Sequence, residues 1–133
     1  MRQLTDHIVE RDAANHQLKI SVLDEPGQGG ANHEYLVDWK DGMRFRPDSP
    51  NEQASCATAI NFQNGPIQEV GVNGLTHEAL TAILIDRLRS FQAGPFAGRE
   101  NAIALTHYEE ALMWLQKRTR ARMARGVEGT HQK

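Results

Sequence analysis

The sequence predicts an α+β fold, in which an N-terminal antiparallel β-sheet precedes a C-terminal hairpin of two antiparallel helices. Apolar residues recur at every second position in the first half of the chain, which is typical of half-buried strands. In the last third they recur at helical spacing on both sides of a Gly-Pro pair, which predicts a turn. We expect one domain over residues 1–133, with a β region at 1–72, a helical hairpin at 76–125 and a tail at 126–133.

The β region is expected to hold three strands. They are expected in the segments HQLKISVLDE (16–25), HEYLVDWKD (33–41) and ASCATAINF (54–62). The first two alternate apolar and polar residues, and the third is small and β-prone. The segment GMRFRPDSPNEQ (42–53) contains two prolines and is expected to be a loop. Val70 and Val72 are expected to add a short extended piece.

The first helix is expected to run from His77 to about Gln92. Thr76 is a good N-cap residue, and Gly94 before Pro95 is expected to end the helix in a left-handed conformation. The apolar residues of this helix cover nearly its whole circumference. We therefore expect it to be covered on more than one side, by the sheet, by the second helix and by another protomer.

The second helix is expected to run from about Arg99 to Arg125 and to end at Gly126. Its helical periodicity defines one main apolar stripe that would face the first helix. The stripe consists of Leu105, Tyr108, Leu112 and Leu115. Ile103 and Trp114 lie off that stripe.

The charge of the chain is unevenly distributed. The formal net charge is −2, yet residues 117–125 hold five basic residues and no acid, so the rest of the chain carries −7. A basic island on an acidic body suits a small anion better than a nucleic acid, which favours an overall basic surface. We therefore expect no nucleic-acid partner.

The composition also disfavours a membrane-spanning helix, a signal peptide, an internal disulfide and a zinc site. No apolar run approaches the ~20 residues of a membrane-spanning helix, and the first twelve residues lack the apolar stretch of a signal peptide. The single Cys56 cannot form an internal disulfide and fits a reducing compartment. No His spacing resembles a zinc site. We expect no membrane partner, no metal, no cofactor and a cytoplasmic location.

Three arginines near the end of the second helix are candidates for anion binding. Arg118, Arg122 and Arg125 follow i, i+4, i+7 spacing and share one helical face, and His107 and Trp114 lie on nearly the same face. The planar guanidinium group fits phosphate and stacks on aromatic rings. The alternative is a solvated helix end, where cations complement the helix dipole.

The turn between the helices carries the other candidates. Phe91 and Phe96 bracket it, and a Phe face can stack on a base while Asn101 can bond an adenine edge. The alternative is that both rings plug the end of the hairpin and Asn101 caps the second helix. Asn101 and Arg118 are 17 positions apart on one helix, ~25 Å, and a small cyclic nucleotide is roughly half that long. Either two separate sites exist, or two hairpins share one.

Catalysis is the weaker interpretation, and we expect no catalytic residue. An enzyme that degrades a cyclic nucleotide signal stays open as the alternative, with His107 as its general base. Glu109 and Glu110 are consecutive and point about 100° apart on a helix, so they do not form a paired carboxylate site. An oligomeric nucleic-acid binder is a further alternative that the acidic balance disfavours.

Two long stretches resemble a known family. FQNGPIQEVGVNGLTHEAL and IDRLRSFQAGPFAGRENAIALTHYEEALMWLQKRTRARMARGVEGTH, within residues 60–131, are similar to the Thoeris anti-defence type one family of phage proteins, whose hairpin domain is shared with phage anti-CBASS sponges. The resemblance implies a protein of the infected bacterial host's cytoplasm. It would sequester cyclic ADP-ribose isomers, above all glycocyclic ADP-ribose made by TIR proteins, without cleaving them. Some members also bind cyclic di- or trinucleotides.

The resemblance also implies an assembly and a set of site residues. Members form homodimers or hexamers (trimers of dimers), with the site between protomers. The family's ligand contacts correspond here to Phe91 on the adenine, Asn101 orienting it, and Arg118 and Arg122 on the pyrophosphate. Weaker candidates are Phe96, Arg99, His107, Trp114 and Arg125. A further basic contact from the β half would be Arg44 or Arg46, and Gly98 stands where the family commonly has Cys.

Overall fold

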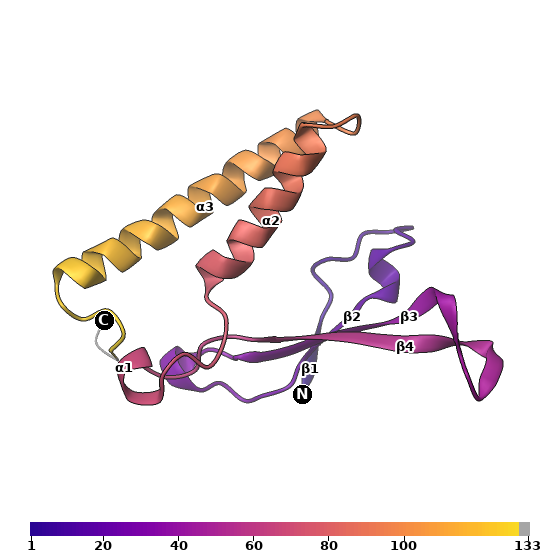
Figure 1. Cartoon of the computed structure of the whole chain (residues 1–133), viewed down its shortest axis with the longest axis horizontal. Helices are drawn as coiled ribbons and strands as arrows, with labels where there is room; N and C mark the ends of the chain where they lie inside the picture. The colour runs from indigo at the N-terminus through magenta and orange to yellow at the C-terminus, as the bar shows by residue number, and fades with distance from the viewer. Residues whose placement is uncertain (131–133) are drawn as a thin grey trace. The chain divides into compact units, whose positions relative to one another are not determined.

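Two compact units make up the chain. The structure, a computed structural model, describes residues 1–130. The first unit comprises residues 1–64 and holds every described strand, and the second begins at Gly65 and holds the α-helices (Figure 1). This order confirms the predicted α+β class. The expectation that residues 1–133 behave as one domain stays a prediction.

Four antiparallel strands form one sheet in the order β1-β2-β3-β4. Their bounds are Arg2–Leu4 for β1, Lys19–Val22 for β2, Glu34–Arg46 for β3 and Ser49–Asn61 for β4, with short 3-10 turns at Asn15–Gln17 and Gln28–Gly30. β2, β3 and β4 confirm the three predicted strands, whereas β1 was not predicted. Val22 at the end of β2 is fully buried, so the small core of this unit lies beside β2.

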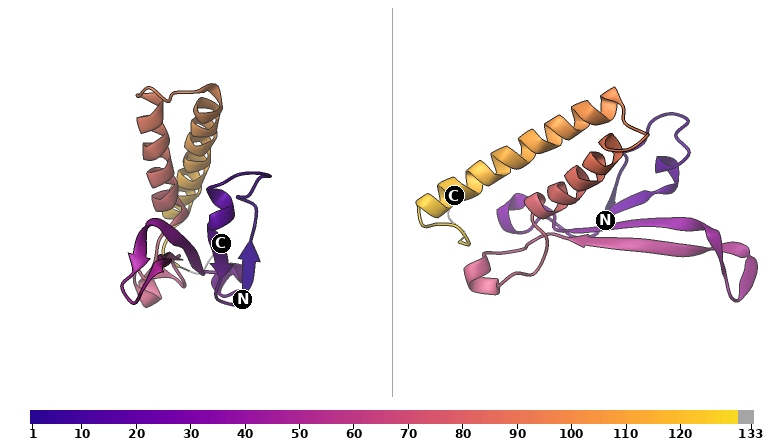
Figure 2. Two further views of the ribbon diagram at one scale, coloured as in Figure 1. Left: turned by 90° about the vertical axis from the view of Figure 1, so that its right-hand side faces the viewer. Right: turned by 45° about the horizontal axis from the view of Figure 1, so that its top comes forward.

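The predicted loop at residues 42–53 is wrong, because most of it is strand. β3 continues to Arg46 and β4 begins at Ser49. β2 pairs only with residues Tyr35–Asp38 of β3, so beyond that point β3 and β4 continue as a two-stranded ribbon (Figure 2). Pro50 is tolerated in β4 because β4 is an edge strand and needs hydrogen bonds on one side only.

The connection between β2 and β3 is held by one carboxylate. Asp24 accepts hydrogen bonds from the backbone N–H groups of His33 (2.9 Å) and Glu34 (3.2 Å). Partial desolvation raises the pKa of Asp24, but the hydrogen bonds to the carboxylate, led by those from His33 and Glu34, together hold the pKa below its ordinary value. The ionised carboxylate thus fixes the start of β3.

The prediction of a short extended piece at Val70 and Val72 is wrong for Val70. Ile67–Val70 form a single helical turn, α1. Pro66 precedes it with φ −67°, a value preset for the start of a helix. Gly71 ends the turn with φ +72°, where a side chain would be strained, and its N–H donates to the Ile67 carbonyl.

The helical hairpin confirms the predicted bounds. α2 spans His77–Gln92 and α3 spans Arg99–Ala124, and they run antiparallel side by side (Figures 1 and 2). Gly94 is not in the left-handed region, so the predicted mode of termination is wrong. Instead, the Gln92 side-chain carbonyl accepts a hydrogen bond from the N–H of Gly98 (3.1 Å), which closes the turn.

α2 and α3 pack through the predicted stripe. Three of its four residues are half-buried: Leu105, Leu112 and Leu115. Tyr108 is more exposed, while Ile85 of α2 is 2% exposed. Arg89 of α2 and Glu109 of α3 form an ion pair of 2.7 Å across the hairpin. Contact between apolar side chains therefore holds α2 against α3, and the exposed ion pair adds little stability.

Much of the apolar surface of α2 stays exposed in the single chain. Ile83 is 61% exposed and Leu84 is exposed as well, although both lie in the apolar circumference that was expected to be covered. Coverage by another protomer stays a prediction. Within residues 1–130, no helix is both long and apolar enough to span a bilayer.

The predicted tail at residues 126–133 is described only in part. Residues 131–133 lie outside the described residues, and residues 126–130 fold back against the helices. Gly126 ends α3 with φ +73°, as predicted. Val127 is buried, and the Gly129 carbonyl accepts a hydrogen bond from the N–H of Gln68 in α1 (3.0 Å).

The N-cap of α2 provides a test of local helix stabilisation. Thr76 Oγ1 accepts a hydrogen bond from the N–H of Ala79 (3.1 Å). Replacing the hydroxyl, as in Thr76→Ala, should lower the free energy of unfolding by about 1 kcal/mol, measured by denaturant titration. Thr76→Ser keeps the acceptor and should unfold as the wild type does. Equal destabilisation by both variants would contradict the role of the cap.

Candidate functional site

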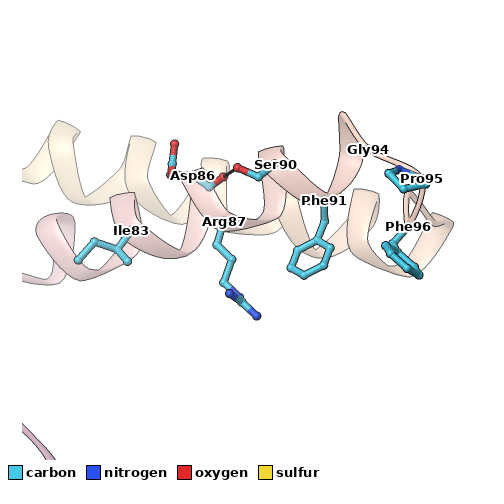
Figure 3. A pocket seen from close by; sticks show the side chains of 8 residues that line it. All are labelled: Ile83, Asp86, Arg87, Ser90, Phe91, Gly94, Pro95 and Phe96. Atoms are coloured by element: carbon cyan, nitrogen blue, oxygen red, sulfur yellow. Dashed lines mark hydrogen bonds between the residues drawn. The ribbon is translucent and has the colours of Figure 1, made fainter.

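A cavity of about 570 Å³ lies at the end of the helical hairpin, on the C-terminal half of α2 and the turn that follows it (Figure 3). It is lined by Ile83, Asp86, Arg87, Ser90, Phe91, Gly94, Pro95 and Phe96. All of these residues belong to the second unit. The cavity is larger than a buried water site and falls in the size range of small-ligand pockets.

The helical repeat explains why these side chains meet. Ile83, Arg87 and Phe91 are spaced four residues apart and therefore form one row along α2. The turn returns the chain so that Phe96 lies beside the end of that row. Figure 3 shows Arg87, Phe91 and Phe96 projecting from the same side of the hairpin, with Phe91 between the other two.

The two aromatic rings are accessible. Phe91 is 36% exposed and Phe96 is 76% exposed. The alternative that both rings plug the end of the hairpin is therefore wrong for Phe96, which hardly packs against the chain. Two exposed rings beside one cavity can stack on a planar group from solution.

Arg87 supplies the positive charge of the cavity. Its Cζ lies 5.1 Å from the centre of the Phe91 ring, which is a cation–π contact. Asp86 also lines the cavity, and its backbone carbonyl accepts a hydrogen bond from the Ser90 hydroxyl (3.0 Å). In Figure 3 the side chains of Asp86 and Ser90 lie on the other side of the ribbon from Arg87.

Asn101 is not part of this cavity in the single chain. It is half-buried in the first turn of α3, and the N-cap of that helix is Gly98, without a capping side chain. The alternative that Asn101 caps the helix is therefore wrong. Asn101 and Arg118 both belong to the continuous helix α3, so the structure keeps them ~25 Å apart along its axis.

The basic end of α3 is largely exposed. Arg118 and Arg125 are both exposed, and Trp114 is 59% exposed with Lys117 Nζ 4.9 Å from its ring centre. His107 is exposed in the middle of α3 and does not line the cavity. The weaker candidate Arg99 is likewise exposed, at the first position of the helix.

Arg122 differs from its neighbours, although the sequence placed it on their face. It is 8% exposed. Its guanidinium donates to Glu128 Oε2 (3.0 Å) and to the backbone carbonyls of Val127 (3.0 Å) and Thr130 (3.1 Å). In the single chain Arg122 therefore anchors residues 126–130, and its contact with a ligand stays a prediction.

The two arginines suggested for the β half are engaged within the β3–β4 ribbon. Arg44 pairs with Asp41 (3.0 Å), and Arg46 pairs with Asp48 (2.7 Å) and Glu52 (2.8 Å). All three pairs are exposed on at least one side, so they contribute little stability. The pairs nevertheless neutralise most of the positive charge of Arg44 and Arg46 with carboxylates of the same ribbon.

Cys56 of β4 is half-buried between two of these charges. The Asp41 carboxylate lies 3.8 Å and the Arg44 guanidinium 3.7 Å from its sulfur. The pKa of Asp41 is held below its ordinary value, chiefly by a hydrogen bond from the N–H of Met43 and next by Arg44. Among residues 1–130, no three His, Cys, Asp or Glu side chains gather in a way that could hold a metal ion.

Sequence reasoning missed most of the cavity wall. The lining residues that it did not propose as ligand contacts are Ile83, Asp86, Arg87, Ser90, Gly94 and Pro95. A signal was available, because Phe91 was already a candidate and the positions four and eight residues before it form one row on the same helix. Arg87, the charged residue between Ile83 and Phe91, was the informative residue of that row.

Comparison with known proteins identifies the hairpin. Residues 55–120 match the family model of the Acb2/Tad1 hairpin domain. A curated protein of Bacillus phage SBSphiJ7 named Thoeris anti-defense 1 is 58% identical over 74 residues, which are 56% of this chain and 52% of that protein. The chain belongs to the Acb2/Tad1 hairpin family. The predicted membership of the Thoeris anti-defence family is thus confirmed.

The Acb2/Tad1 hairpin domain contains the whole cavity. The match also includes Asn101 and Arg118 but ends at residue 120, before Arg122 and Arg125. It begins within β4, so most of the sheet lies outside it. The chain spans about half the length of the curated phage protein it matches.

The buried position of Arg122 leads to a stability prediction. Arg122→Ala removes charge-assisted hydrogen bonds and leaves two backbone carbonyls without this donor. The free energy of unfolding should fall by about 2 kcal/mol, measured by denaturant titration, and residues 126–130 should exchange their amide hydrogens faster. Arg118→Ala, an exposed change on the same helix, is the control. Equal unfolding of the two variants would contradict the anchoring role.

Proposed function

We propose that this chain is a non-catalytic phage sponge that binds cyclic ADP-ribose signals of Thoeris TIR defence, above all glycocyclic ADP-ribose, in the cytoplasm of the infected host. The observation that carries the proposal is the accessible cavity with two Phe rings and an arginine, within residues that match the Acb2/Tad1 hairpin domain. The chain is also 58% identical over 74 residues to a protein named Thoeris anti-defense 1. Holding the signal intact would keep the defence effector inactive.

The cavity suits the adenine part of such a ligand. Phe91 presents a partly exposed ring at the cavity wall, and base stacking on an aromatic side chain is worth ~1–3 kcal/mol. Phe96 stands across the turn and can cover a bound base from a second direction (Figure 3). The apolar wall at Ile83 and Pro95 excludes water from the stacked base, which strengthens the polar contacts around it.

Two copies of the chain are needed to complete the proposed site. Arg118 lies near the end of α3 that is far from the cavity, ~25 Å from Asn101 along the helix axis. An antiparallel pair of hairpins brings the basic end of one α3 beside the cavity of the other. The exposed Ile83 and Leu84 support such an association, because apolar side chains on an uncovered helix face favour burial. A homodimer, or a hexamer built from dimers, satisfies this requirement.

Sequestration requires tight binding rather than turnover. A sponge competes with the effector for a scarce signal, and nanomolar affinity corresponds to about −12 kcal/mol. Stacking, two or more guanidinium contacts and a preformed cavity can together reach that value. His107, the general base of the alternative signal-degrading enzyme, does not line the cavity. Asp86 is the acidic residue of the lining, and its side chain projects from the other side of the ribbon from Arg87 (Figure 3), so the lining favours binding over turnover.

Cyclic di- and trinucleotides form a second proposed ligand class. They share the base and phosphate chemistry of cyclic ADP-ribose, and the exposed Arg118, Arg125 and Trp114 offer further cation and stacking groups at the other end of α3. Simultaneous binding of both ligand classes would indicate two sites. Competition between them would indicate one.

Calorimetric titration with glycocyclic ADP-ribose tests the proposal. We expect nanomolar affinity, and chromatography of the ligand released by heating the complex should recover it unchanged. Recovery of an altered ligand would instead support the enzyme alternative. Absence of binding to cyclic ADP-ribose isomers would refute the proposal.

Two variants test the assigned contacts. Phe91→Ala removes the stacking ring and should weaken binding about tenfold to a hundredfold, since stacking contributes ~1–3 kcal/mol. Arg118→Ala removes a phosphate contact and should weaken it comparably. Phe45→Ala on the β3–β4 ribbon and Arg120→Ala on α3 are matched controls, because both residues are exposed and lie outside the cavity. Sedimentation should show the same oligomer for all four proteins.

A further inference from the structure

Arg87 is the cationic residue of the cavity, and neither the sequence pattern nor the family comparison assigned it a role. Its guanidinium lies over the Phe91 ring at 5.1 Å, at the wall of the 570 Å³ cavity. A cation over one face of an aromatic ring holds that ring in place and leaves its other face for stacking. The five N–H donors of the guanidinium are not used by this contact, because it is electrostatic.

The charge of Arg87 is not neutralised in the chain as described. Within residues 1–130, no carboxylate forms an ion pair with Arg87, whereas Arg44, Arg46, Arg89 and Arg122 each have one. Asp86 precedes it on the helix but projects from the other side of the ribbon in Figure 3. An arginine at the cavity wall that forms no ion pair within the described residues favours an anionic ligand.

We infer that Arg87 binds a phosphate of the nucleotide whose base stacks on Phe91. The inference rests on the proposed function and adds to it a specificity-determining residue, which selects phosphorylated ligands at the same end of the hairpin as the base. Arg118 of a second copy would then hold the phosphates from the opposite side. The class of ligand is a base joined to a diphosphate or phosphodiester, and a nucleoside without phosphate would bind weakly.

The same helix supplies a matched control. Arg89 carries the same charge two residues further on, is exposed, and pairs with Glu109 across the hairpin at 2.7 Å. It does not line the cavity. Any effect that arises only from the net charge of α2 should therefore be shared by Arg87→Ala and Arg89→Ala.

The experiment titrates glycocyclic ADP-ribose into the full chain and its variants by calorimetry, at low and at physiological salt. Arg87→Ala should weaken binding about tenfold, equivalent to ~1.4 kcal/mol, and should make the affinity less sensitive to salt. Arg87→Met fills the space over Phe91 without charge and should be as weak as Arg87→Ala. Arg87→Lys should recover part of the affinity and of the salt sensitivity, and Arg89→Ala should match the wild type.

The results of these titrations distinguish failure of the inference about Arg87 from failure of the proposed function. If the wild type binds and Arg87→Ala binds equally well, the inference is wrong while the proposed function stands. If Arg87→Met binds as the wild type does, Arg87 only supports the ring, and the phosphate contact is wrong. If Arg89→Ala is as weak as Arg87→Ala, the effect is one of overall charge, which also overturns the inference. If the wild type itself does not bind, the proposed function fails and the inference fails with it.

Discussion

The antiparallel packing of α2 against α3 is the constraint on which the proposed site depends. It fixes the turn at residues 93–98 and, with it, the distance between Phe91 and Phe96 on either side of the cavity. The same packing places the C-terminal end of α3 far from the cavity, because each residue of a straight helix adds 1.5 Å along its axis. A hairpin of this length therefore separates aromatic groups from most of its cations, and a ligand that needs both is best served by two copies.

The arginines of this chain show how similar residues take different physical roles. Arg122 is buried and bonded to the segment that follows α3, so its charge is used within the fold. Arg89 is exposed and paired across the hairpin, where solvent screens the interaction. Arg87 and Arg118 have neither arrangement. A count of basic residues therefore overstates the charge available to a ligand, and the ion pairs of the structure identify which cations remain.

The β unit and the hairpin differ in how much of each the family match covers. The family match begins at residue 55 and leaves most of the sheet outside it, while the cavity lies entirely within it. In the β3–β4 ribbon, Arg44 and Arg46 pair with carboxylates of the ribbon itself. The ribbon extends beyond the reach of β2, and an isolated two-stranded hairpin is only marginally stable. The backbone pairing of β3 with β4 therefore defines its shape in the single chain.

The sequence by itself determined the local structure of the hairpin: the bounds of α2 and α3, the cap at Thr76 and the turn containing Pro95. Helical periodicity, capping and turn chemistry act over a few residues, so they are visible in the sequence. Alternation of apolar residues likewise located β2 and β3, and β-prone composition located β4. Phe91 and Phe96 were recognised as candidates for base stacking because they bracket the turn, and Arg118 as a candidate for anion binding because it belongs to a basic run.

Only the tertiary structure decided the rest. Most of residues 42–53 became strand because β3 and β4 pair with each other on both sides of the turn at residues 47–48. Pro47 lies in that turn, and Pro50 lies on an edge strand, where the missing N–H is tolerated. Arg122 became buried because residues 126–130 return to cover it, which helical spacing cannot indicate. Arg87 became the cation of the cavity because Phe96 comes back beside Phe91. Burial and pairing depend on contacts between residues distant in sequence, and a local pattern carries no information about them.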